Sequence, residues 1–510
     1  MNHLLLLWEE KPWLVIICSA IIVRLIAVIF AGGYGYEDDH FLVIKPAQGW
    51  VQGQDSNNWI VDNYEENTSG RSLLYPGLHY VLFLSLETIG IDNPMVKMLV
   101  SRLLHAIFSL LVVVYGYRLT KLLATQNHAN FVGLLLATFW MLPQISVRNL
   151  VEAVPIPLLM IASYWLIQYE RKEKLSSILF WVGILFGICF SFRYQTLFFA
   201  GGVGLGYLFT RQWRITVILA LSTLVPIILL HGVGDWLATG VPFGKVWYYI
   251  DYNIINSTSY FSEPWYTYLL ILLGVFIPPV SFFLLFGFFS SYKIHFPVWL
   301  GVFIFLLFHS IFPNKQERFI FTIIPHLLVF GYLGWKQFLA NSPKWQQYQA
   351  FRRGSWVFFW IVNLIMVVIY SSYYNKQARI EGMRYLAEQG DVQAIMLVDL
   401  HREVLKPAPL FYLEKEVPVY DFNKGDDINL MQDSLRNLPP EQFPNYVVIM
   451  HKRGRDISDT PEQLSPLFPE LSYQTTASMS LVDRVRNYFN KSIKLDDWVI
   501  YRVESTSSSE

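Results

Sequence analysis

Charged side chains are scarce in this chain. They make up only 15% of its 510 residues, whereas about a quarter is usual for a soluble protein. Lysine plus arginine and aspartate plus glutamate number 39 each, so the net charge is zero. This balance excludes a disordered chain, a nucleic-acid binder with a large basic field and most ordinary soluble enzymes. With 54% hydrophobic and 17% aromatic residues, the composition predicts a polytopic membrane protein.

Cysteine is also nearly absent. The two cysteines, Cys18 and Cys189, both lie in apolar runs, which excludes a disulfide framework and a cysteine metal site. The mean hydropathy of +0.35 is modest for a chain buried in lipid throughout. We therefore expect a membrane body together with a sizeable water-facing part.

Eleven apolar stretches are candidates for membrane-spanning helices, because roughly 17–25 apolar residues cross the hydrocarbon core. They lie at about 13–31, 97–118, 130–147, 153–168, 176–190, 195–209, 215–234, 267–291, 296–311, 319–339 and 355–373. A further apolar stretch, 73–91, contains Pro76, Gly77, His79 and Glu87.

The positions of lysine and arginine between these stretches predict the orientation. Cytoplasmic loops carry the excess of basic residues, and placing all basic clusters there requires that 73–91 does not cross the membrane. We expect 73–91 to be an interfacial or re-entrant helix, with the amino terminus in the cytoplasm and the carboxyl terminus outside. The clusters are Arg118 with Lys121, the run 171–174, Arg211 with Arg214, Lys293, and Lys336, Lys344, Arg352 and Arg353.

Two domains follow from this pattern. Residues 1–373 form the predicted transmembrane domain, with about 11 helices, a large first outer loop at 32–96 and an outer aromatic loop at 235–266. Residues 374–510 have ordinary soluble composition and predict a small C-terminal α/β domain outside the membrane. Its expected strands are the short apolar runs AIMLVDL, VPVYDF, NYVVIM and WVIYRVE.

Three consecutive carboxylates, Glu37, Asp38 and Asp39, follow the first predicted span. Such a run is often a solvated loop. At the outer membrane surface, however, a carboxylate is placed to take a proton from the hydroxyl of an acceptor whose partner substrate is a lipid. The position therefore favours a catalytic role for this acidic run.

Three cations break the positive-inside pattern on the outer face. Arg193 lies in the aromatic turn 192–196, and either binds phosphate or forms an internal ion pair with Glu152. Lys315 and Arg318 are three residues apart at the start of a helix, on one face. They suit an anion, although Glu317 is placed to neutralise one of them.

For each further candidate for substrate binding, the sequence allows either a functional or a purely structural role. Arg71, near Tyr75, either holds an anionic headgroup or extends to the membrane interface. Glu263 and Trp265 end the aromatic loop, where they line a substrate cleft or anchor the chain at the interface. Arg102 and His105 lie inside a span, where they are functional or form a structural polar pair.

In their order along the chain, these motifs resemble the family 22 glycosyltransferases of the GT-C superfamily, which include mannosyltransferases of N-glycan precursor and GPI-anchor assembly. Members typically carry His-Pro-Asp-Glu-His-Phe in the first loop, and this chain has YEDDHF at 36–41. Members carry His-Lys-Glu-x-Arg-Phe before a late span, and this chain has NKQERF at 314–319. The family's Tyr-Gly-x-His/Glu-Pro-Trp segment corresponds to FSEPW at 261–265. The similarity spans about 36–325.

The resemblance implies a GT-C fold and transfer of a hexose, mannose first, from a polyprenyl-phosphate sugar to an acceptor hydroxyl with inversion. The acceptor would be a glycolipid or glycan at the extracytoplasmic face. Asp38 is the expected base, with Asp39 and Glu37 as the other carboxylates of the motif. Lys315, Arg318 and Arg193 are the expected stabilisers of the leaving phosphate.

We expect no cofactor, because a monophosphate donor needs no metal to bridge a diphosphate; a divalent ion on the acidic run is the alternative. We also expect no nucleic acid as a partner. A transporter or flippase of lipid-linked sugars and an inactive GT-C-like subunit are the competing functions. Transporters often contain inverted repeats, and no such symmetry is visible here. The bacterial inner membrane is the expected location, with the endoplasmic reticulum membrane as the alternative.

Overall fold

The computed structural model describes residues 2–55, 70–172, 176–259, 262–451, 460–490 and 496–504. Parts of the predicted first outer loop (56–69), part of the basic run at 171–174, and Phe261 fall outside these ranges. The chain divides into two compact units. The helical unit comprises Met1–Ile29, Pro46–Ser85 and Leu99–Ser372, and the sheet unit comprises Phe30–Lys45, Leu86–Met98 and Tyr373–Glu510.

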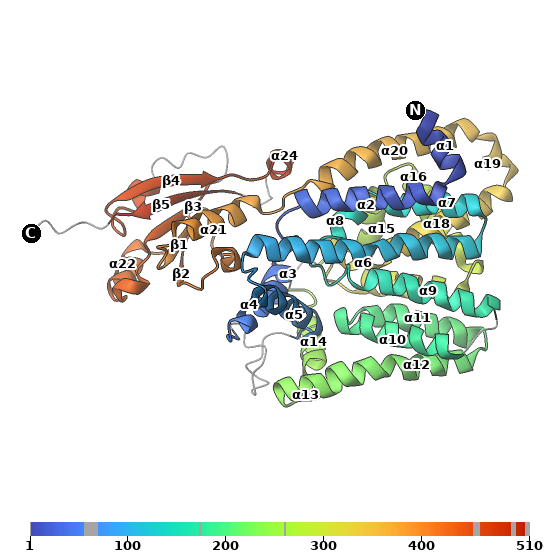
Figure 1. The fold of residues 1–510 in the computed structure, drawn as a ribbon, viewed down its shortest axis with the longest axis horizontal. Helices are drawn as coiled ribbons and strands as arrows, with labels where there is room; N and C mark the ends of the chain where they lie inside the picture. Colours follow the sequence, from blue (N-terminus) through green and yellow to red (C-terminus); the bar gives the residue numbers. More distant parts are fainter. Residues whose placement is uncertain are drawn as a thin grey trace, which may run out of the picture. The chain divides into compact units, whose positions relative to one another are not determined.

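Long apolar helices form the body of the helical unit (Figure 1). Its main helices are α2 (Pro12–Phe30), α6 (Pro94–Leu123), α7 (Gln126–Thr138), α9 (Pro155–Lys172), α10 (Ser176–Phe192), α11 (Thr196–Phe209), α12 (Trp213–Ile227), α15 (Thr267–Val275), α16 (Val280–Ser290), α17 (Phe296–Ile311), α18 (Ile324–Ala340) and α20 (Gln349–Ser371). Further helices are α1 (Asn2–Glu10), α4 (Lys45–Val51), α5 (Leu74–Thr88), α8 (Met141–Ile145), α13 (Gly234–Thr239), α14 (Gly244–Ile255) and α19 (Pro343–Gln347). A 3₁₀ segment, η4 (Glu317–Ile323), leads into α18, and a π-helical segment, η2 (Ile228–Val233), joins α12 to α13.

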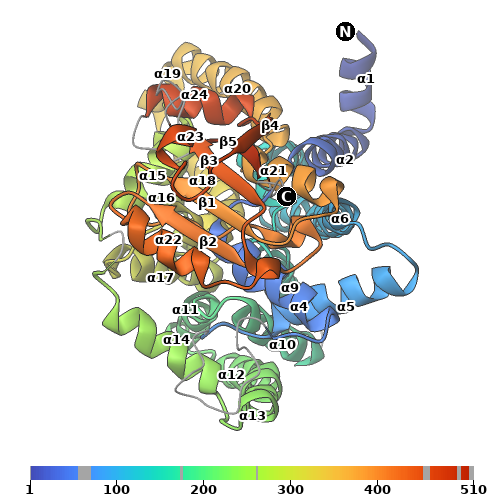
Figure 2. The same ribbon diagram turned by 90° about the vertical axis from the view of Figure 1, so that its left-hand side faces the viewer.

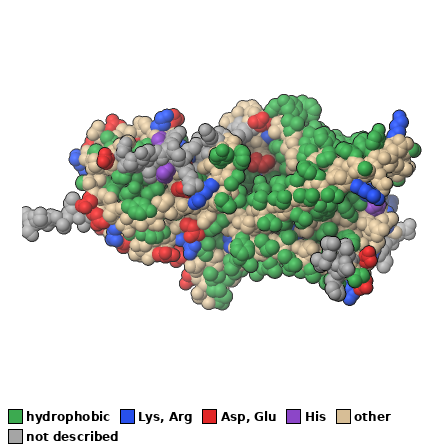
Figure 3. All heavy atoms as spheres, turned by 90° about the horizontal axis from the view of Figure 1, so that it is seen from above, with side chains coloured by type: hydrophobic (Ala, Val, Ile, Leu, Met, Phe, Trp, Pro, Cys, Tyr) green, Lys and Arg blue, Asp and Glu red, His purple; other side chains and the backbone are tan. Residues whose placement is uncertain are grey.

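The surface and length of these helices confirm a multi-pass membrane protein. Hydrophobic side chains cover much of the visible surface of the helical unit (Figure 3). Large apolar side chains such as Leu221 and Val368 are 62% and 67% exposed. In the described part of the chain, five helical segments are long and apolar enough to cross a membrane: Pro12–Phe30, Pro94–Leu123, Trp213–Thr239, Glu317–Ala340 and Gln349–Ser371. Each of the other predicted spans contains shorter helices, and the total of 11 remains a prediction. The stretch 73–91 does contain a helix, α5.

An arginine inside the first span is fully satisfied by neighbouring helices. Arg24 of α2 is 2% exposed. Its Nε donates to Ser109 Oγ at 2.8 Å, and its Nη1 donates to the carbonyl oxygens of Ala137 at 3.1 Å and Ala20 at 3.3 Å. A charge at this depth is tolerated because it faces the bundle and is hydrogen-bonded. Arg24 thereby ties α2 to α6 and α7.

Glycines allow α16 and α18 to approach closely. A Cβ atom added to Gly287 of α16 would lie 1.9 Å from the carbonyl oxygen of Gly331 in α18. One turn further on, a Cβ at Gly334 would lie 2.0 Å from Gly287 O. Small residues at such contacts let backbones pack directly, which is a main source of helix association in lipid.

The sheet unit contains a five-stranded mixed sheet. Its strands are β1 (Ile395–Asp399), β2 (Val419–Asn423), β3 (Tyr446–His451), β4 (Leu471–Ala477) and β5 (Asp497–Val503), in the order β2-β1-β3-β5-β4. Figure 2 shows β1 between β2 and β3. β1 is parallel to β2 and β3, whereas β5 is antiparallel to β3 and β4. Four strands were expected from the sequence, and β4 was missed.

Helices accompany the sheet and complete its core. They are α21 (Gln377–Gln389), α22 (Ile428–Arg436), α23 (Thr460–Gln463) and α24 (Leu481–Phe489), with the 3₁₀ segments η5 (Leu410–Leu413) and η6 (Pro440–Gln442). Met396, Val447 and Phe468 are at most 1% exposed in a core that also includes Leu435 of α22. Consecutive residues of β1 and β3 are buried, as in strands covered on both faces, which explains why these short apolar runs form strands.

The glycine contact between α16 and α18 can be tested directly. We expect Gly287→Ala to lower the melting temperature of the detergent-solubilised protein, because its new methyl group meets backbone that cannot move independently; overpacking of this kind costs roughly 1–3 kcal/mol. Gly201→Ala, in α11, is the matched control, because no heavy atom lies within 4 Å of its added Cβ. Equal melting temperatures for the Gly287 variant and the wild type would contradict the close packing.

Candidate functional site

A buried carboxylate of the helical unit gathers two arginines from distant parts of the chain. Glu152, in the turn before α9, is fully buried. Its Oε1 lies 3.3 Å from Arg193 Nη2, at the turn between α10 and α11, and 3.6 Å from Arg318 Nε, in η4. Thr322 Oγ1 also donates to the backbone oxygen of Glu152 at 2.9 Å. The internal pair of Arg193 with Glu152, one of the two expected roles of this arginine, is thus present.

Lys315 joins the same cluster through the turn that precedes η4. Its side chain is 5% exposed, and its Nζ donates to Phe312 O. The Nζ atom lies 5.8 Å from the ring centroid of Tyr268, whose hydroxyl donates to Gln316 O at 3.1 Å. Burial lowers the pKa of Lys315, and the nearby carboxylate of Glu263 opposes that shift. We call Arg193, Arg318, Lys315 and Glu152 the cation cluster.

The end of the aromatic loop is bound to this turn. Ser262 pairs with Asn314 in an isolated antiparallel bridge, and Glu263 N donates to Pro313 O at 3.1 Å. Of the two substrate-binding candidates here, Glu263 therefore lies beside the cation cluster. Trp265 is 65% exposed, with its ring edge against Tyr266, as an interfacial anchor would be.

The charges of the cation cluster do not cancel. Arg193, Arg318 and Lys315 are between 3% and 8% exposed. The two arginines pair with Glu152, whereas Lys315 lies within electrostatic reach of Glu263. Neither oxygen of Glu152 has an aligned hydrogen bond in the described part of the chain. Arg193 also stacks over the ring of Phe319, with its Cζ 4.9 Å from the centroid. Guanidinium and ammonium groups gathered in this way are the side chains that bind anions with several oxygens.

The intramembrane candidates form a polar group of their own. Tyr75 Oη and His105 Nε2 lie 2.7 Å apart, and His105 Nδ1 lies 2.7 Å from Ser101 O. Arg102 Nε donates to Val28 O at 2.9 Å, which joins α6 to α2. Arg102 and His105 thus have hydrogen-bonding partners inside the protein, which matches the structural role given above as the alternative to a functional one.

A second polar group near the outer loop was not singled out from the sequence. Asp235 is 1% exposed; its Oδ2 accepts from Lys245 N at 3.2 Å and lies 3.6 Å from His231 Nδ1. Burial lowers the pKa of the Lys245 ammonium to about 8, while Asp235 and Asp55 oppose the shift. The sequence does contain a local cue to this group: Asp235 is the first residue of DWLATGVPF (235–243), a turn-rich segment of the aromatic loop.

Arg71 lies within electrostatic reach of this second group. Burial raises the pKa of Tyr194, Asp235 adds to the shift, and Arg71 opposes it. The preceding Gly70 packs on the backbone of the aromatic loop, where an added Cβ would lie 2.6 Å from Tyr249 N. The structure therefore brings Arg71, the turn at Tyr194 and the loop around Asp235 together.

The acidic run belongs to the sheet unit, where α3 (Glu37–Asp39) holds it. Lys376 Nζ donates to Glu37 Oε1 at 2.8 Å, and Arg379 Nη1 donates to both carboxylate oxygens at 2.8 and 2.9 Å. Lys406 Nζ lies 3.4 Å from Oε1. Burial alone would raise the pKa of Glu37, but these cations lower it to about 2. A carboxylate held so strongly in its ionised form is a poor base.

The neighbours of Glu37 differ sharply in exposure. Asp39 is 2% exposed, whereas Asp38 is half-buried. His40 stacks on Tyr34 and Tyr412, with ring centroids 4.5 and 5.5 Å apart, and burial lowers its pKa to about 3. His40 is therefore a neutral packing residue that fixes the acidic run against the 3₁₀ segment η5. Among the three carboxylates, Asp38 is the most suitable to meet a substrate.

The sequence and structure of the whole chain match known glycosyltransferases. Residues 13–401 match the model of the Alg9-like mannosyltransferase family. The chain belongs to this family. It is therefore a membrane mannosyltransferase, and the resemblance inferred from the motifs is confirmed.

Relatives of this Alg9-like mannosyltransferase include two curated proteins. It is 21% identical over 496 residues to the GPI mannosyltransferase 3 of Yarrowia lipolytica, covering 90% of each chain. It is 22% identical over 418 residues to the mannosyltransferase APTG1 of Arabidopsis thaliana, covering 74% of this chain and 71% of that protein.

A solved structure shares the fold. The crystal structure of ArnT from Cupriavidus metallidurans, bound to undecaprenyl phosphate, superposes with a TM-score of 0.59 at 14% identity, covering 98% of this chain and 99% of the other. The expected GT-C fold, with a small sheet-containing domain after the helices, is thereby confirmed.

The ion pairs of Glu37 predict a defined pH dependence of stability. Because its folded pKa lies near 2, below the ordinary value of 4.5, the ionised carboxylate stabilises the protein above pH 4.5, and this contribution is lost as the pH falls towards 2. We expect Glu37→Gln to lower the free energy of unfolding by roughly 3 kcal/mol at neutral pH. Denaturant unfolding of both proteins should show this difference shrinking as the pH is lowered below 4.5.

Asp433→Asn is the control for this comparison. Asp433 pairs with Arg436 at 3.8 Å, but both side chains are about 70% exposed. Exposed pairs contribute little, so this variant should unfold like the wild type at every pH. A Glu37→Gln variant as stable as the wild type at neutral pH would show that the three ion pairs do not hold the acidic run.

Proposed function

We propose that this mannosyltransferase transfers mannose from a polyprenyl-phosphate sugar to a hydroxyl group of a glycolipid or glycan, at the extracytoplasmic face, with inversion of the anomeric centre. The observation that carries the proposal is the cation cluster, in which three buried cations lie together and two of them pair with Glu152. Such a group of cations fits a lipid phosphate, which must be held as the glycosidic bond breaks.

The donor phosphate is assigned to Arg193, Arg318 and Lys315 on chemical grounds. Two guanidinium groups offer several donors to phosphate oxygens, and the ammonium group of Lys315 adds a point charge. The structural relative ArnT was solved with undecaprenyl phosphate, a lipid of the class proposed here. In our proposal Glu152 orients the two arginines without cancelling their charge.

The reaction is a single in-line displacement. Asp38 accepts the proton of the acceptor hydroxyl as its oxygen attacks the anomeric carbon of mannose. The bond from that carbon to the phosphate oxygen breaks, and the electron pair leaves with the polyprenyl phosphate. Negative charge that builds on the leaving phosphate is stabilised by the cations. Inversion follows because attack and departure occur on opposite faces of the sugar.

No metal has a step in this scheme. A monophosphate leaving group requires no ion to bridge two phosphates, and arginine and lysine side chains meet its charge. We propose metal-independent transfer on this basis. The acidic run would be the place for a divalent ion, but Glu37 is already engaged by three cations.

We propose the bacterial inner membrane as the location, with the endoplasmic reticulum membrane as the alternative. The amino terminus lies in the cytoplasm and the C-terminal domain outside, because this orientation keeps the basic clusters on the cytoplasmic side. Membership of a mannosyltransferase family favours transfer over transport of lipid-linked sugars. An inactive subunit is the second candidate, because Tyr36 and Glu37 depart from the family's usual motif.

Substitution of the acidic run tests the base. We expect Asp38→Asn to reduce kcat by roughly 10²–10⁴-fold, the usual contribution of a general base, and Asp39→Asn to have a smaller effect because Asp39 is buried. The assay uses membranes or purified protein with polyprenyl-phosphate mannose and a membrane extract as acceptor. Full activity of both variants would eliminate the proposed base, and an inactive wild type would support the inactive-subunit alternative.

Substitution of the lysine in the cation cluster tests the phosphate site. We expect Lys315→Met to reduce kcat by about 10²-fold, as loss of one stabilising group at a developing anion does, and Lys315→Arg to recover part of the activity. Lys344→Met, in α19, is the control on the predicted cytoplasmic side and should act like the wild type. Unchanged kcat and donor KM in Lys315→Met would remove this lysine from the phosphate site.

A further inference from the structure

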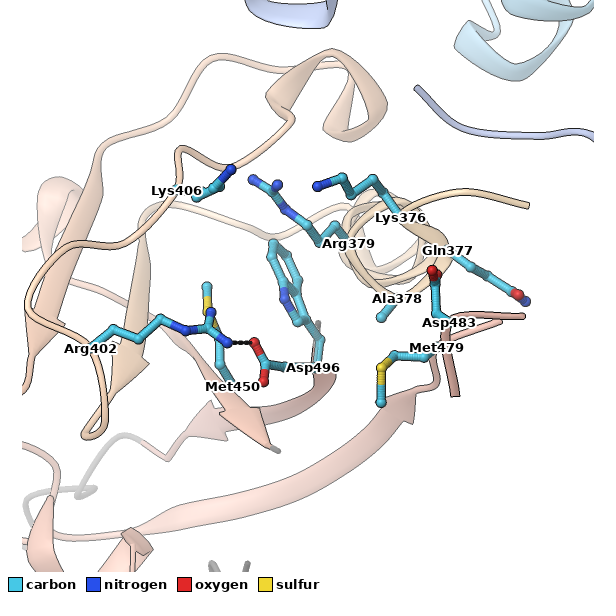
Figure 4. A pocket seen from close by; sticks show the side chains of 11 residues that line it. Lys376, Gln377, Ala378, Arg379, Arg402, Lys406, Met450, Met479, Asp483 and Asp496 are labelled. Carbon is cyan, nitrogen blue, oxygen red and sulfur yellow. Dashed lines mark hydrogen bonds and ion pairs between the residues drawn. The ribbon is translucent and has the colours of Figure 1, made fainter. Parts of the chain in front are cut away.

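A pocket in the sheet unit is lined by cations that the proposed reaction does not use. Its empty volume is about 460 Å³, part of which is open to solvent. Lys376, Arg379, Arg402 and Lys406 line it, together with the indole ring of Trp498 (Figure 4). Lys376 and Arg379 come from the start of α21, Arg402 and Lys406 from the segment after β1, and Trp498 from β5. Residues far apart in the sequence thus supply one set of like charges.

Three cations of this pocket share one carboxylate, Glu37. Lys376, Arg379 and Lys406 all pair with Glu37, so two positive charges remain within this group of four. Figure 4 shows the ends of the three basic side chains turned toward one another. Gathering like charges costs free energy unless an anion joins them.

The two other carboxylates of the pocket are engaged elsewhere. Asp496 binds Arg402, which also lies 3.2 Å from Asp399. Asp483 accepts hydrogen bonds from Tyr373 and, at 2.9 Å, from Ser480. Lys376, Arg379 and Lys406 meet at Glu37, and Arg379 Cζ lies 6.0 Å from the ring centroid of Trp498.

The backbone adds to the attraction for an anion. Gln377 and Ala378, the first two residues of α21, line the pocket, and the first N–H groups of a helix have no partner within the helix. The preceding Lys376 makes no side-chain cap to this end, which carries partial positive charge. Lys376 has a φ of +58°, a left-handed conformation that is unfavourable for lysine. Strain of this kind tends to persist at binding sites.

We propose that this pocket is a phosphate-binding site, in which Lys406, Arg379, Lys376 and the amino end of α21 hold the oxygens of a phosphate group. Arginine and lysine recognise phosphate through charge-assisted hydrogen bonds. The apolar faces of Trp498 and Met450 suit the sugar or glycerol portion of a headgroup that carries this phosphate. The phosphate is a free ion or part of a glycolipid acceptor; the latter source rests on the proposed function.

The site explains a feature of the acidic run. Glu37 replaces a position that is proline in the family's usual motif, and it binds the same cations that line the pocket. A ligand that binds Lys406 therefore competes with Glu37 for this lysine, and Glu37 is the residue next to Asp38. Occupation of the pocket would be coupled to the position of the acidic run.

Thermal unfolding of the full-length protein in an uncharged detergent tests the site. Two probes are titrated at constant ionic strength: inorganic phosphate and glycerophosphoglycerol, a soluble phosphodiester headgroup. A ligand that binds the folded state raises the melting temperature with its concentration, which gives an apparent Kd. We expect Lys406→Glu to weaken the binding of at least one probe about tenfold or more. Lys406→Arg should bind like the wild type. Lys406 is 57% exposed, so its substitution should not prevent folding.

Lys424→Glu is the matched control, because Lys424 is an exposed lysine of the same unit and the change in net charge is identical. It should leave both affinities unchanged. Tighter binding of the phosphodiester supports a lipid headgroup as the source, and binding of inorganic phosphate alone supports a free ion. Equal affinities of Lys406→Glu and the wild type for both probes, or no response of the wild type to either, would overturn the site.

The same measurement separates this inference from the proposed function. Asp38→Asn should bind both probes normally, because binding needs no general base. If the wild type shows no transfer activity but binds the probes in a way that depends on Lys406, the phosphate site is supported and the proposed reaction is not. Active transfer without Lys406-dependent binding would overturn the site and leave the reaction intact.

Discussion

The helical unit depends on one buried carboxylate. Glu152 holds Arg193 and Arg318 from two other segments, at 3.3 and 3.6 Å. Burying a charge is costly unless an opposite charge accompanies it, so these three segments must come together for any of them to be tolerated away from water. Two arginines accompany this one carboxylate, and Lys315 lies close by. The arrangement that allows these charges to be buried is also the one on which the proposed phosphate site rests.

The acidic run shows how neighbouring carboxylates acquire different properties from their surroundings. Glu37 is ionised and fixed by Lys376, Arg379 and Lys406, Asp39 is buried, and Asp38 is half-buried. In sequence the three are equivalent. Their different environments distinguish Glu37, which anchors the loop through ion pairs, from Asp38, which is partly open to solvent. Glu37 takes the anchoring role at a position where the family usually has proline.

Much of the fold could be predicted because apolar runs report directly on burial. Four of the five strands were expected for the same reason. The fifth, Leu471–Ala477, has the sequence LSYQTTA and is only partly buried. It lies at the edge of the sheet, and its polar residues do not form the apolar run by which the other strands were predicted. Arg193 with Glu152 was one of two alternatives visible in the sequence. The pairing of Glu37 with residues about 340 positions later could not be predicted, because the local sequence pattern carries no information about such distant contacts.

The partners of Glu37 lie 339 and 342 residues further along the chain. A ribosome therefore completes most of the protein before the first loop can settle, while the early helices are already in the membrane. The enzyme is thus expected to complete the anchoring of its acidic run late in synthesis. A chain that ended before Lys376 would lack this lysine, Arg379 and Lys406, the ion-pair partners of Glu37.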